Sequence, residues 1–217
     1  MKKLSFILWL IIPLVSIASS EKSFSDDSVK LSIRLNPIRL FESTFALNYE
    51  QRIANHWSLD VTAMGTYGSK DGLSDSYIRM AMASIDMDGY YYNTSMIMGW
   101  GIMVQPRYFL SLSKKAPVGA YTAPFAMFRR VSIVSKKWMT GNQYEECIHN
   151  LNIYAMGVVL GWKIPIKKVY CLDFYVGGAF RLSKYDSEKT FTKYNKWTKL
   201  DYSGVLPTIG VSIGILK

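Results

Sequence analysis

The chain has 217 residues and a formal net charge of +10, and 49% of its residues are hydrophobic. This length fits a single domain. No nucleic-acid-binding motif accompanies the basic excess, so no nucleic-acid partner is expected. The charge suits anionic lipid headgroups, lipopolysaccharide phosphates or acidic polymers, or it simply keeps exposed loops soluble. No apolar run after residue 20 has the roughly 20 residues that a membrane-spanning helix needs, which excludes a helical membrane protein.

The first twenty residues have the three parts of a secretory signal peptide. Lys2 and Lys3 form a positive n-region, residues 4–15 are mostly apolar, and the small residues of 16–20 offer cleavage after Ala18 or Ser20. The apolar part is short for a membrane anchor, and no stop-transfer pattern follows it. We therefore predict that residues 1–20 are a cleaved signal peptide and that 21–217 form a single exported domain with two fewer positive charges.

Eight segments of the remaining chain alternate apolar and polar residues with a period of two. This is the period of a β-strand, because successive side chains point to opposite faces of a sheet. The segments lie at about 29–36, 44–51, 57–67, 100–111, 119–131, 151–162, 168–182 and 204–216. Connections near 52–56, 112–118 and 163–168 are short, and so is the one near 37–43. Those near 68–99, 132–150 and 183–203 are long.

Large apolar residues share one face in each segment. Examples are Ile33 in the first segment, Leu47 in the second, Leu59 in the third and Ile102 in the fourth. In the fifth segment we expect this apolar face to hold Tyr121, Ala123, Phe125 and Met127. The last three segments place alternate residues of 154–162, 170–182 and 209–215 on the same face.

Ionisable residues are expected on the opposite, polar face of the segments. They are Lys30, Arg34, Glu50, Asp60, Arg107, Arg130, Asp173 and Arg181. Charges that point into a barrel can pair there, whereas a charge facing lipid costs about 2–4 kcal/mol at the bilayer midplane. Eight strands leave an interior that side chains about fill. We therefore predict a salt-bridged interior network and prefer it to a narrow pore.

Three features favour a membrane location over a soluble sandwich, which the alternation alone does not exclude. The polar face is rich in small residues, which suit a narrow barrel interior. Several segments have 11 or more residues, as a tilted membrane crossing needs. Aromatic residues also mark both ends of the apolar face. One ring would comprise Tyr49, Trp57, Tyr108, Tyr121, Trp162 and Tyr170, and the other Tyr67, Trp100, Tyr154 and Phe180. We predict an all-β, transmembrane, antiparallel up-and-down barrel, most simply of eight strands.

The last long loop is a candidate contact surface. It interleaves basic and aromatic residues, which suit phosphate and sugar surfaces such as lipopolysaccharide, and equally suit a solvated hairpin. Its candidate contact residues are Lys189, Lys193, Tyr194, Lys196 and Trp197.

Catalytic and metal-binding patterns are weak. His56 and Ser58 form a His-x-Ser pair that resembles part of the motif of outer-membrane lipid A deacylases, but a polar turn explains the pair more simply. Likewise, the stretch from Glu145 to His149 is interpreted as loop polarity, not as a metal site. We assign no catalytic residue, metal or cofactor, and we expect Cys147 and Cys171 to lie too far apart for a disulfide.

Several short motifs give the chain a resemblance to known proteins. It resembles small outer-membrane barrel proteins of Bacteroidota-type bacteria, many of unknown function, and more distantly the OmpA/OmpX-type eight-stranded barrels. The motifs are Lys30-Leu31 through Leu35-Asn36-Pro37, Leu47-Asn48-Tyr49-Glu50, His56-Trp57-Ser58-Leu59, Gly99-Trp100-Gly101, Val104-Gln105-Pro106-Arg107-Tyr108 and Pro207-Thr208-Ile209-Gly210-Val211. The resemblance implies an aromatic residue at the end of the last strand, where this sequence has Leu216-Lys217.

These observations together predict a monomeric protein of the bacterial outer membrane with a structural or surface-interaction role. Its expected contacts are outer-membrane lipid, lipopolysaccharide, and the periplasmic assembly machinery during insertion. The alternatives are a lipid-modifying enzyme of the deacylase kind, a narrow pore, and a soluble, lipocalin-like exported barrel.

Overall fold

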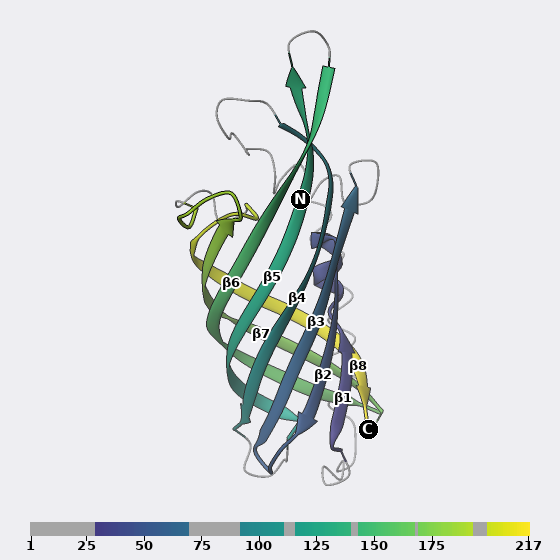
Figure 1. Ribbon diagram of the computed structural model, residues 1–217. Coiled ribbons are helices and arrows are strands. Elements are labelled where there is room, and N and C mark those ends of the chain that lie inside the picture. Colours follow the sequence, from purple (N-terminus) through teal and green to yellow (C-terminus); the bar gives the residue numbers. More distant parts are fainter. Residues whose placement is uncertain (1–28, 70–91, 111–115, 140–142, 168, 193–198) are drawn as a thin grey trace, which may run out of the picture.

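The computed structural model describes residues 29–69, 92–110, 116–139, 143–167, 169–192 and 199–217, which contain eight strands and one 3-10 helix. In chain order the elements are β1 (Leu31–Leu35), η1 (Pro37–Glu42), β2 (Thr44–Arg52), β3 (Trp57–Ser69), β4 (Tyr92–Phe109), β5 (Gly119–Met139), β6 (Gln143–Ile166), β7 (Tyr170–Tyr185) and β8 (Gly204–Leu216). Each strand pairs antiparallel with the next, and β8 pairs with β1, so the sheet closes into a barrel (Figure 1). The predicted all-β, up-and-down topology of eight strands is confirmed.

The barrel closes at the seam between β1 and β8. Ile33 lies opposite Ile215, and Arg34 lies opposite Gly214. A Cβ atom on Gly214 would lie 2.6 Å from both the Cα and the Cγ atoms of Arg34, a separation that real side chains do not reach. Glycine at this position therefore lets the Arg34 side chain pass close to β8 on its way into the interior.

Alternating side chains separate the inside of the barrel from the outside. Along β2, Asn48 and Glu50 are buried, whereas Leu47 and Tyr49 are exposed. The same alternation leaves large exposed apolar side chains on the outer face of every strand except β5, a set that we call the outer belt, whereas the outer face of β5 has smaller exposed residues such as Pro124 and Ala126. The outer belt comprises Ile33, Leu35, Phe45, Leu47, Tyr49, Trp57, Tyr67, Trp100, Ile102, Val104, Tyr108, Tyr154, Met156, Val158, Leu160, Trp162, Tyr170, Val176, Phe180, Ile209, Ile213 and Ile215.

The predicted orientation of the fifth strand is wrong. The side chains of Tyr121, Ala123 and Phe125 are buried in the interior, so the alternate residues of β5 face outward. Both faces of this strand are apolar, so the sizes of the side chains on the two faces do not tell which face points outward. The interior at this level is an apolar cluster that also contains Met103 and Val159, and it takes the larger side chains of β5.

Three strands are much longer than predicted. β4, β5 and β6 have 18, 21 and 24 residues, and they run beyond the other strands at the end of the barrel away from the C-terminus, which we call the extended end (Figure 1). Most of the expected loop at 132–150 is therefore strand, because β5 and β6 remain paired from Lys163 to Gln143. Polar residues interrupt the apolar alternation there, whereas backbone pairing does not depend on it.

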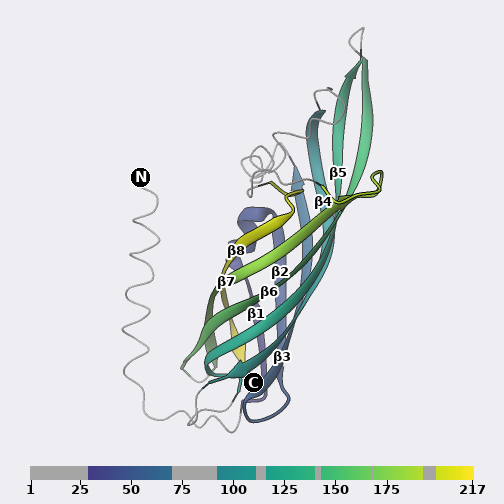
Figure 2. The same cartoon turned by 90° about the vertical axis from the view of Figure 1, so that its left-hand side faces the viewer.

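The link between β1 and β2 forms η1. The Asn36 side chain accepts hydrogen bonds from the backbone N–H groups of Ile38 and Arg39 at 3.1 and 3.3 Å, and Pro37 suits the first turn. Ser43, in the left-handed region at φ 54°, ends the helix. η1 contacts β2 and β8 and lies at the extended end of the barrel (Figure 2). Among the described residues, no helix combines the length and the apolar character needed to cross a membrane.

Candidate functional site

Six ionisable side chains from six strands meet inside the barrel, and we call them the ionic network. They are Arg34 of β1, Glu50 of β2, Asp60 of β3, Arg107 of β4, Lys163 of β6 and Asp173 of β7. Each residue is at most 1% exposed. The network holds three acids and three bases, so its formal charge is balanced.

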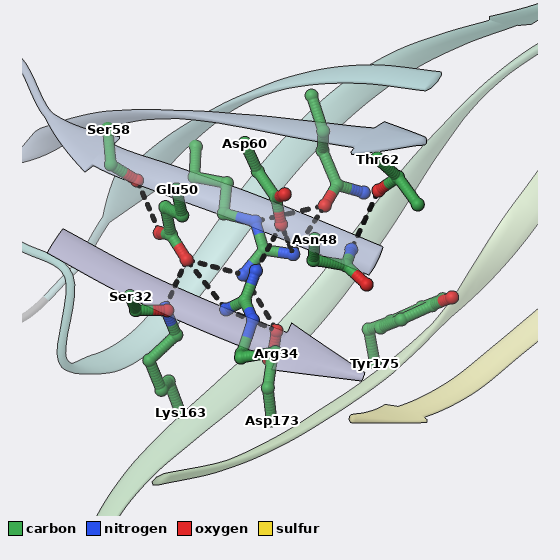
Figure 3. A network of polar contacts seen from close by, with 12 residues as sticks. Ser32, Arg34, Asn48, Glu50, Ser58, Asp60, Thr62, Lys163, Asp173 and Tyr175 are labelled. Atoms are coloured by element: carbon green, nitrogen blue, oxygen red, sulfur yellow. Dashed lines mark hydrogen bonds and ion pairs between the residues drawn. The ribbon is translucent and has the colours of Figure 1, made fainter. Parts of the chain in front are cut away.

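Arg34 stands between acids from three strands. Its Nη1 atom lies 2.6 Å from Glu50 Oε2 and 2.9 Å from Asp173 Oδ2, and its Nη2 atom donates to Asp60 Oδ2 (Figure 3). Glu50 and Asp60 are directly opposite each other on neighbouring strands. Two like charges in that position would repel each other, but here the Arg34 guanidinium bridges them.

Arg107 binds the same acids from the other side of the interior. Its Nη1 atom lies 2.7 Å from Asp173 Oδ2 and 3.3 Å from Glu50 Oε2, and its Nη2 atom lies 2.5 Å from Asp60 Oδ2. The Nε and Nη2 atoms donate to Gln105 Oε1 at 2.9 and 2.6 Å. The guanidinium carbon lies 4.4 Å from the ring centre of Tyr121, a cation–π contact.

Lys163 completes the network near the end of the barrel that holds the C-terminus. Its ammonium group donates to Glu50 Oε2 and, at 3.2 Å, to Ser32 Oγ (Figure 3). The other oxygen of Glu50 accepts a 2.5 Å hydrogen bond from Ser58 Oγ. Glu50 thus receives three cations and one hydroxyl, and this full set of partners offsets the cost of burying its charge.

Two inward tyrosines lie flat across glycines of the neighbouring strands. Tyr121 is paired with Gly161, and Tyr175 is paired with Gly210. A Cβ atom on either glycine would overlap the ring of its partner tyrosine. The Tyr121 hydroxyl can therefore reach Asp173 Oδ1, to which it donates at 2.8 Å. The glycines therefore leave space for the tyrosine rings, and the Tyr121 ring packs against the ionic network.

A cavity of about 440 Å³ lies on the other side of the interior, between Gln105 of the network region and η1. Its walls are mostly apolar, and its basic residues include Arg39 and Arg129. The two interior regions therefore differ in kind, since one is packed with paired charges and the other is hollow.

The structure brings five of the eight predicted interior residues together. These are Arg34, Glu50, Asp60, Arg107 and Asp173. Arg181 is partly buried at the extended end of the barrel, where its Nε and Nη2 atoms donate to the backbone oxygens of Tyr202 and Lys199 at 2.8 and 2.5 Å.

The two other predicted interior residues lie elsewhere. Lys30 is exposed and precedes β1, where its backbone N–H donates to Lys217 O. Arg130 lies on the outer face of β5 and pairs with Asp186 at 2.6 Å, with both side chains about two-fifths exposed. Its position follows from the reversed orientation of β5, which turns the neighbouring residue, Arg129, inward.

Sequence reasoning missed two buried cations. The predicted connection at 163–168 includes Lys163, which in the structure continues the inward alternation of Val159 and Gly161 by one more step. That alternation is the signal in the sequence that identifies Lys163 as an inward residue. Arg129 is 4% exposed, and its Nη2 atom donates to Thr44 and Thr66 at 2.7 and 2.8 Å. Arg129 lies on the same face of β5 as Tyr121, the face that the sequence pattern wrongly predicts to point outward.

The loop candidates stay largely outside the structure. Lys189 is exposed, as a contact residue would be, and Lys193, Tyr194, Lys196 and Trp197 lie outside the described residues. Nothing in the geometry brings Lys189 to the ionic network.

The weak catalytic, metal-binding and disulfide patterns of the sequence form no active site among the described residues. Ser58 is buried and donates to Glu50, whereas His56 lies in the preceding turn, with its ring centre 6.2 Å from that of Tyr108. Within the described ranges, no group of three or more His, Cys, Asp and Glu side chains could hold a metal ion. Cys147 and Cys171 are both free thiols.

Comparisons with known proteins identify a family without assigning an activity. Neither the search of curated proteins nor the search of solved structures finds a match. One family, described as "Protein of unknown function (DUF3575)", matches residues 7–215. Because this match covers nearly the whole sequence, the chain belongs to the DUF3575 family of proteins of unknown function.

Proposed function

We propose that the protein is an integral β-barrel of the bacterial outer membrane, exported behind a cleaved signal peptide, with a structural or surface-interaction role. The observation that carries the proposal is the outer belt, whose large apolar side chains are exposed on seven of the eight strands of the ring. A soluble monomer rarely exposes apolar patches beyond a few hundred Å². Lipid would cover this surface. The ring is closed where Ser32–Leu35 of β1 pairs with Ile213–Leu216 of β8, and beyond this seam η1 contacts β8.

The distribution of charge on the outer face supports the same proposal. Tyr121 faces inward and does not belong to the predicted aromatic ring. Between the other members of the two rings, the described outward side chains of the strands include no Asp, Glu, Lys or Arg. Arg130, a charged outward residue, lies opposite Trp100 at the aromatic ring nearer the extended end, and Lys136 and Glu146 lie beyond that ring. A band of neutral side chains with charges beyond one edge is the pattern of a lipid-facing surface.

Aromatic side chains mark the edges of this band. At one edge the rings of Trp57 and Tyr108 are in tilted contact with centres 5.0 Å apart. At the other edge the ring centre of Phe128 lies 5.5 Å from that of Trp100 and 5.2 Å from that of Tyr154. Eight residues separate Trp100 from Tyr108, about 26 Å along the strand. At a strand tilt of about 40° this corresponds to ~20 Å of thickness, comparable with the apolar band of known barrels.

The ionic network supports a closed interior over an open pore. Its side chains reach across the ring from six strands and leave each residue at most 1% exposed. We therefore propose that the protein acts through its surfaces and loops, with lipopolysaccharide as a contact of the basic loop that contains Lys189, and that it works as a monomer.

Membrane insertion is tested by fractionating cells that express the full chain and heating the detergent extract before electrophoresis. We expect the protein in the outer-membrane fraction, with a faster-migrating folded form that disappears on boiling. Recovery from the periplasm without detergent would overturn the proposal and favour the soluble, lipocalin-like alternative.

The enzymatic alternative is tested separately. Lipid A masses are compared between cells with the gene and cells without it, and identical masses are expected. An altered acyl pattern would establish a lipid-modifying activity instead.

A further inference from the structure

The cavity between the ionic network and η1 is enclosed by strands from most of the ring. Its volume of about 440 Å³ falls in the lower part of the range of small-molecule sites, roughly 300–1,000 Å³. Apolar residues of β4 to β8 form the walls. They include Met103, Phe125, Met127, Ile153, Val159 and Leu206. The size suits one alkyl chain, whereas a lipid with several chains would be too large.

Positive charge gathers around this cavity. Among the described residues that line it, four are basic, namely Arg39, Arg129, Arg181 and Lys199, and one is acidic, Glu42. Glu42 lies 2.8 Å from Arg39 and 3.8 Å from Arg129. Burial alone would raise the pKa of the Glu42 carboxyl, but Arg39 and Arg129 hold it below its usual value. Within this lining one carboxylate faces four cations, whereas acids and bases balance in the ionic network. Asp201, outside the lining, interacts with Lys199 and Arg181, so Arg39 and Arg129 share only Glu42 among the lining acids.

Of these cations, Arg129 has the guanidinium group that an anionic ligand would stabilise most. It is 4% exposed, and neutral hydroxyls of Thr44 and Thr66 occupy its Nη2 atom. Its Nε atom is buried and has no hydrogen-bond partner among the described residues. A buried donor left without a partner is destabilising, and a buried guanidinium is satisfied best by an anion.

We propose that this cavity binds a single-chain anionic amphiphile, a long-chain carboxylate, with its alkyl chain along the apolar wall and its carboxylate at Arg129. The inference does not depend on a membrane location, because every residue that carries it lies inside the ring or at η1. It adds a ligand-binding site to the proposed structural role.

Direct titration tests the proposal. The full chain is reconstituted in nanodiscs of zwitterionic lipid and titrated with cis-parinaric acid, a fluorescent long-chain carboxylate, and empty nanodiscs provide the background. We expect saturation at one molecule per chain and displacement by palmitate. The neutral methyl ester should bind at least about tenfold more weakly, because it lacks the charge-assisted hydrogen bond.

Two matched pairs of variants locate the site. Arg129→Gln should weaken binding about tenfold, whereas Arg130→Gln, which changes an adjacent outward arginine, should stay within about twofold. Ala155→Phe fills the cavity wall and should abolish saturable binding, whereas Met156→Phe alters only the exposed outer face. Folding of each variant is verified by the heat-dependent electrophoretic shift.

Three outcomes would overturn the proposal. They are equal affinity for the acid and its ester, equal effects of the two arginine variants, and unchanged saturable binding in a folded Ala155→Phe protein. If the protein proves soluble, the same titration is run in buffer without nanodiscs. Failure of the membrane proposal and failure of the ligand proposal are thus distinguished.

Discussion

At the scale of single residues, the interior depends on carboxylates that each serve several cations. Glu50 is the clearest case, since Arg34, Arg107, Lys163 and Ser58 all approach it. Its inward position could be predicted from alternation along its strand. Its partners could not, because alternation tells which face a side chain takes and not which of the other strands it will meet. That information lies in the register of the whole ring.

Replacing Glu50 should reveal how much the barrel depends on this balance. Glu50→Gln leaves three buried cations facing two acids, and we expect a loss of about 3–5 kcal/mol in the free energy of unfolding. The measurement is a urea titration of the folded barrel in detergent, followed by tryptophan fluorescence.

A second substitution provides the control for Glu50. Adding Lys163→Met to Glu50→Gln makes the charges equal again, so part of the lost stability should return. Two results would show that the balance of buried charges does not stabilise the barrel. One is a loss below about 1 kcal/mol in the free energy of unfolding for Glu50→Gln alone, and the other is no recovery of that free energy in the double variant.

At the scale of the strands, sequence predicted the elements whose two faces differ and failed where they do not. β2, β7 and β8 have a large apolar face and a small or charged one, so the segments near 44–51, 168–182 and 204–216 could be recognised from alternation. β5 is apolar on both faces, and its orientation is decided by the neighbours it meets across the ring. The ends of β4, β5 and β6 were missed because pairing continues through polar sequence.

The pairing of tyrosine with glycine across neighbouring strands gives a prediction for these elements. Gly161→Ala would overlap the Tyr121 ring and should cost about 1–3 kcal/mol, the usual range for overpacking. Gly178→Ala is the matched control, because a Cβ atom there meets nothing within 4 Å. Urea midpoints of the two variants give the comparison, and equal midpoints would show that the ring does not need the glycine.

At the scale of the whole molecule, the interior is divided along the barrel into an ionic network and a hollow apolar region. This division explains why the inward charged residues of the sequence predicted the salt-bridged interior network but not the cavity. Alternation marks which residues point inward, whereas the empty volume depends on how far each inward side chain reaches. Alanines such as Ala155 and Ala179 leave the space that larger residues would have filled.

A closed interior should not conduct ions. In planar lipid bilayers we expect no current steps from the unmodified protein. The double variant Glu50→Ala with Lys163→Ala removes a neutral pair from the network, and we expect it to conduct. The control is the double variant Arg130→Ala with Asp186→Ala, which removes an exposed ion pair and should give no current steps. Currents from the unmodified protein would favour the narrow-pore alternative.

The unequal length of the strands also determines how far the molecule reaches. From Tyr154 at the edge of the outer belt, β6 continues back to Gln143, eleven residues or about 36 Å along the strand. An isolated two-stranded ribbon of this length would be marginal, but the buried side chains of Ile97, Val131, Ile133 and Leu151 brace its base. At the strand tilt of about 40° used above, the hairpin of an embedded barrel would stand roughly 28 Å beyond the outer belt, close to the thickness of the hydrocarbon core, about 30 Å. A partner that approaches from the side of the extended end would then meet the hairpin before it meets the lipid surface.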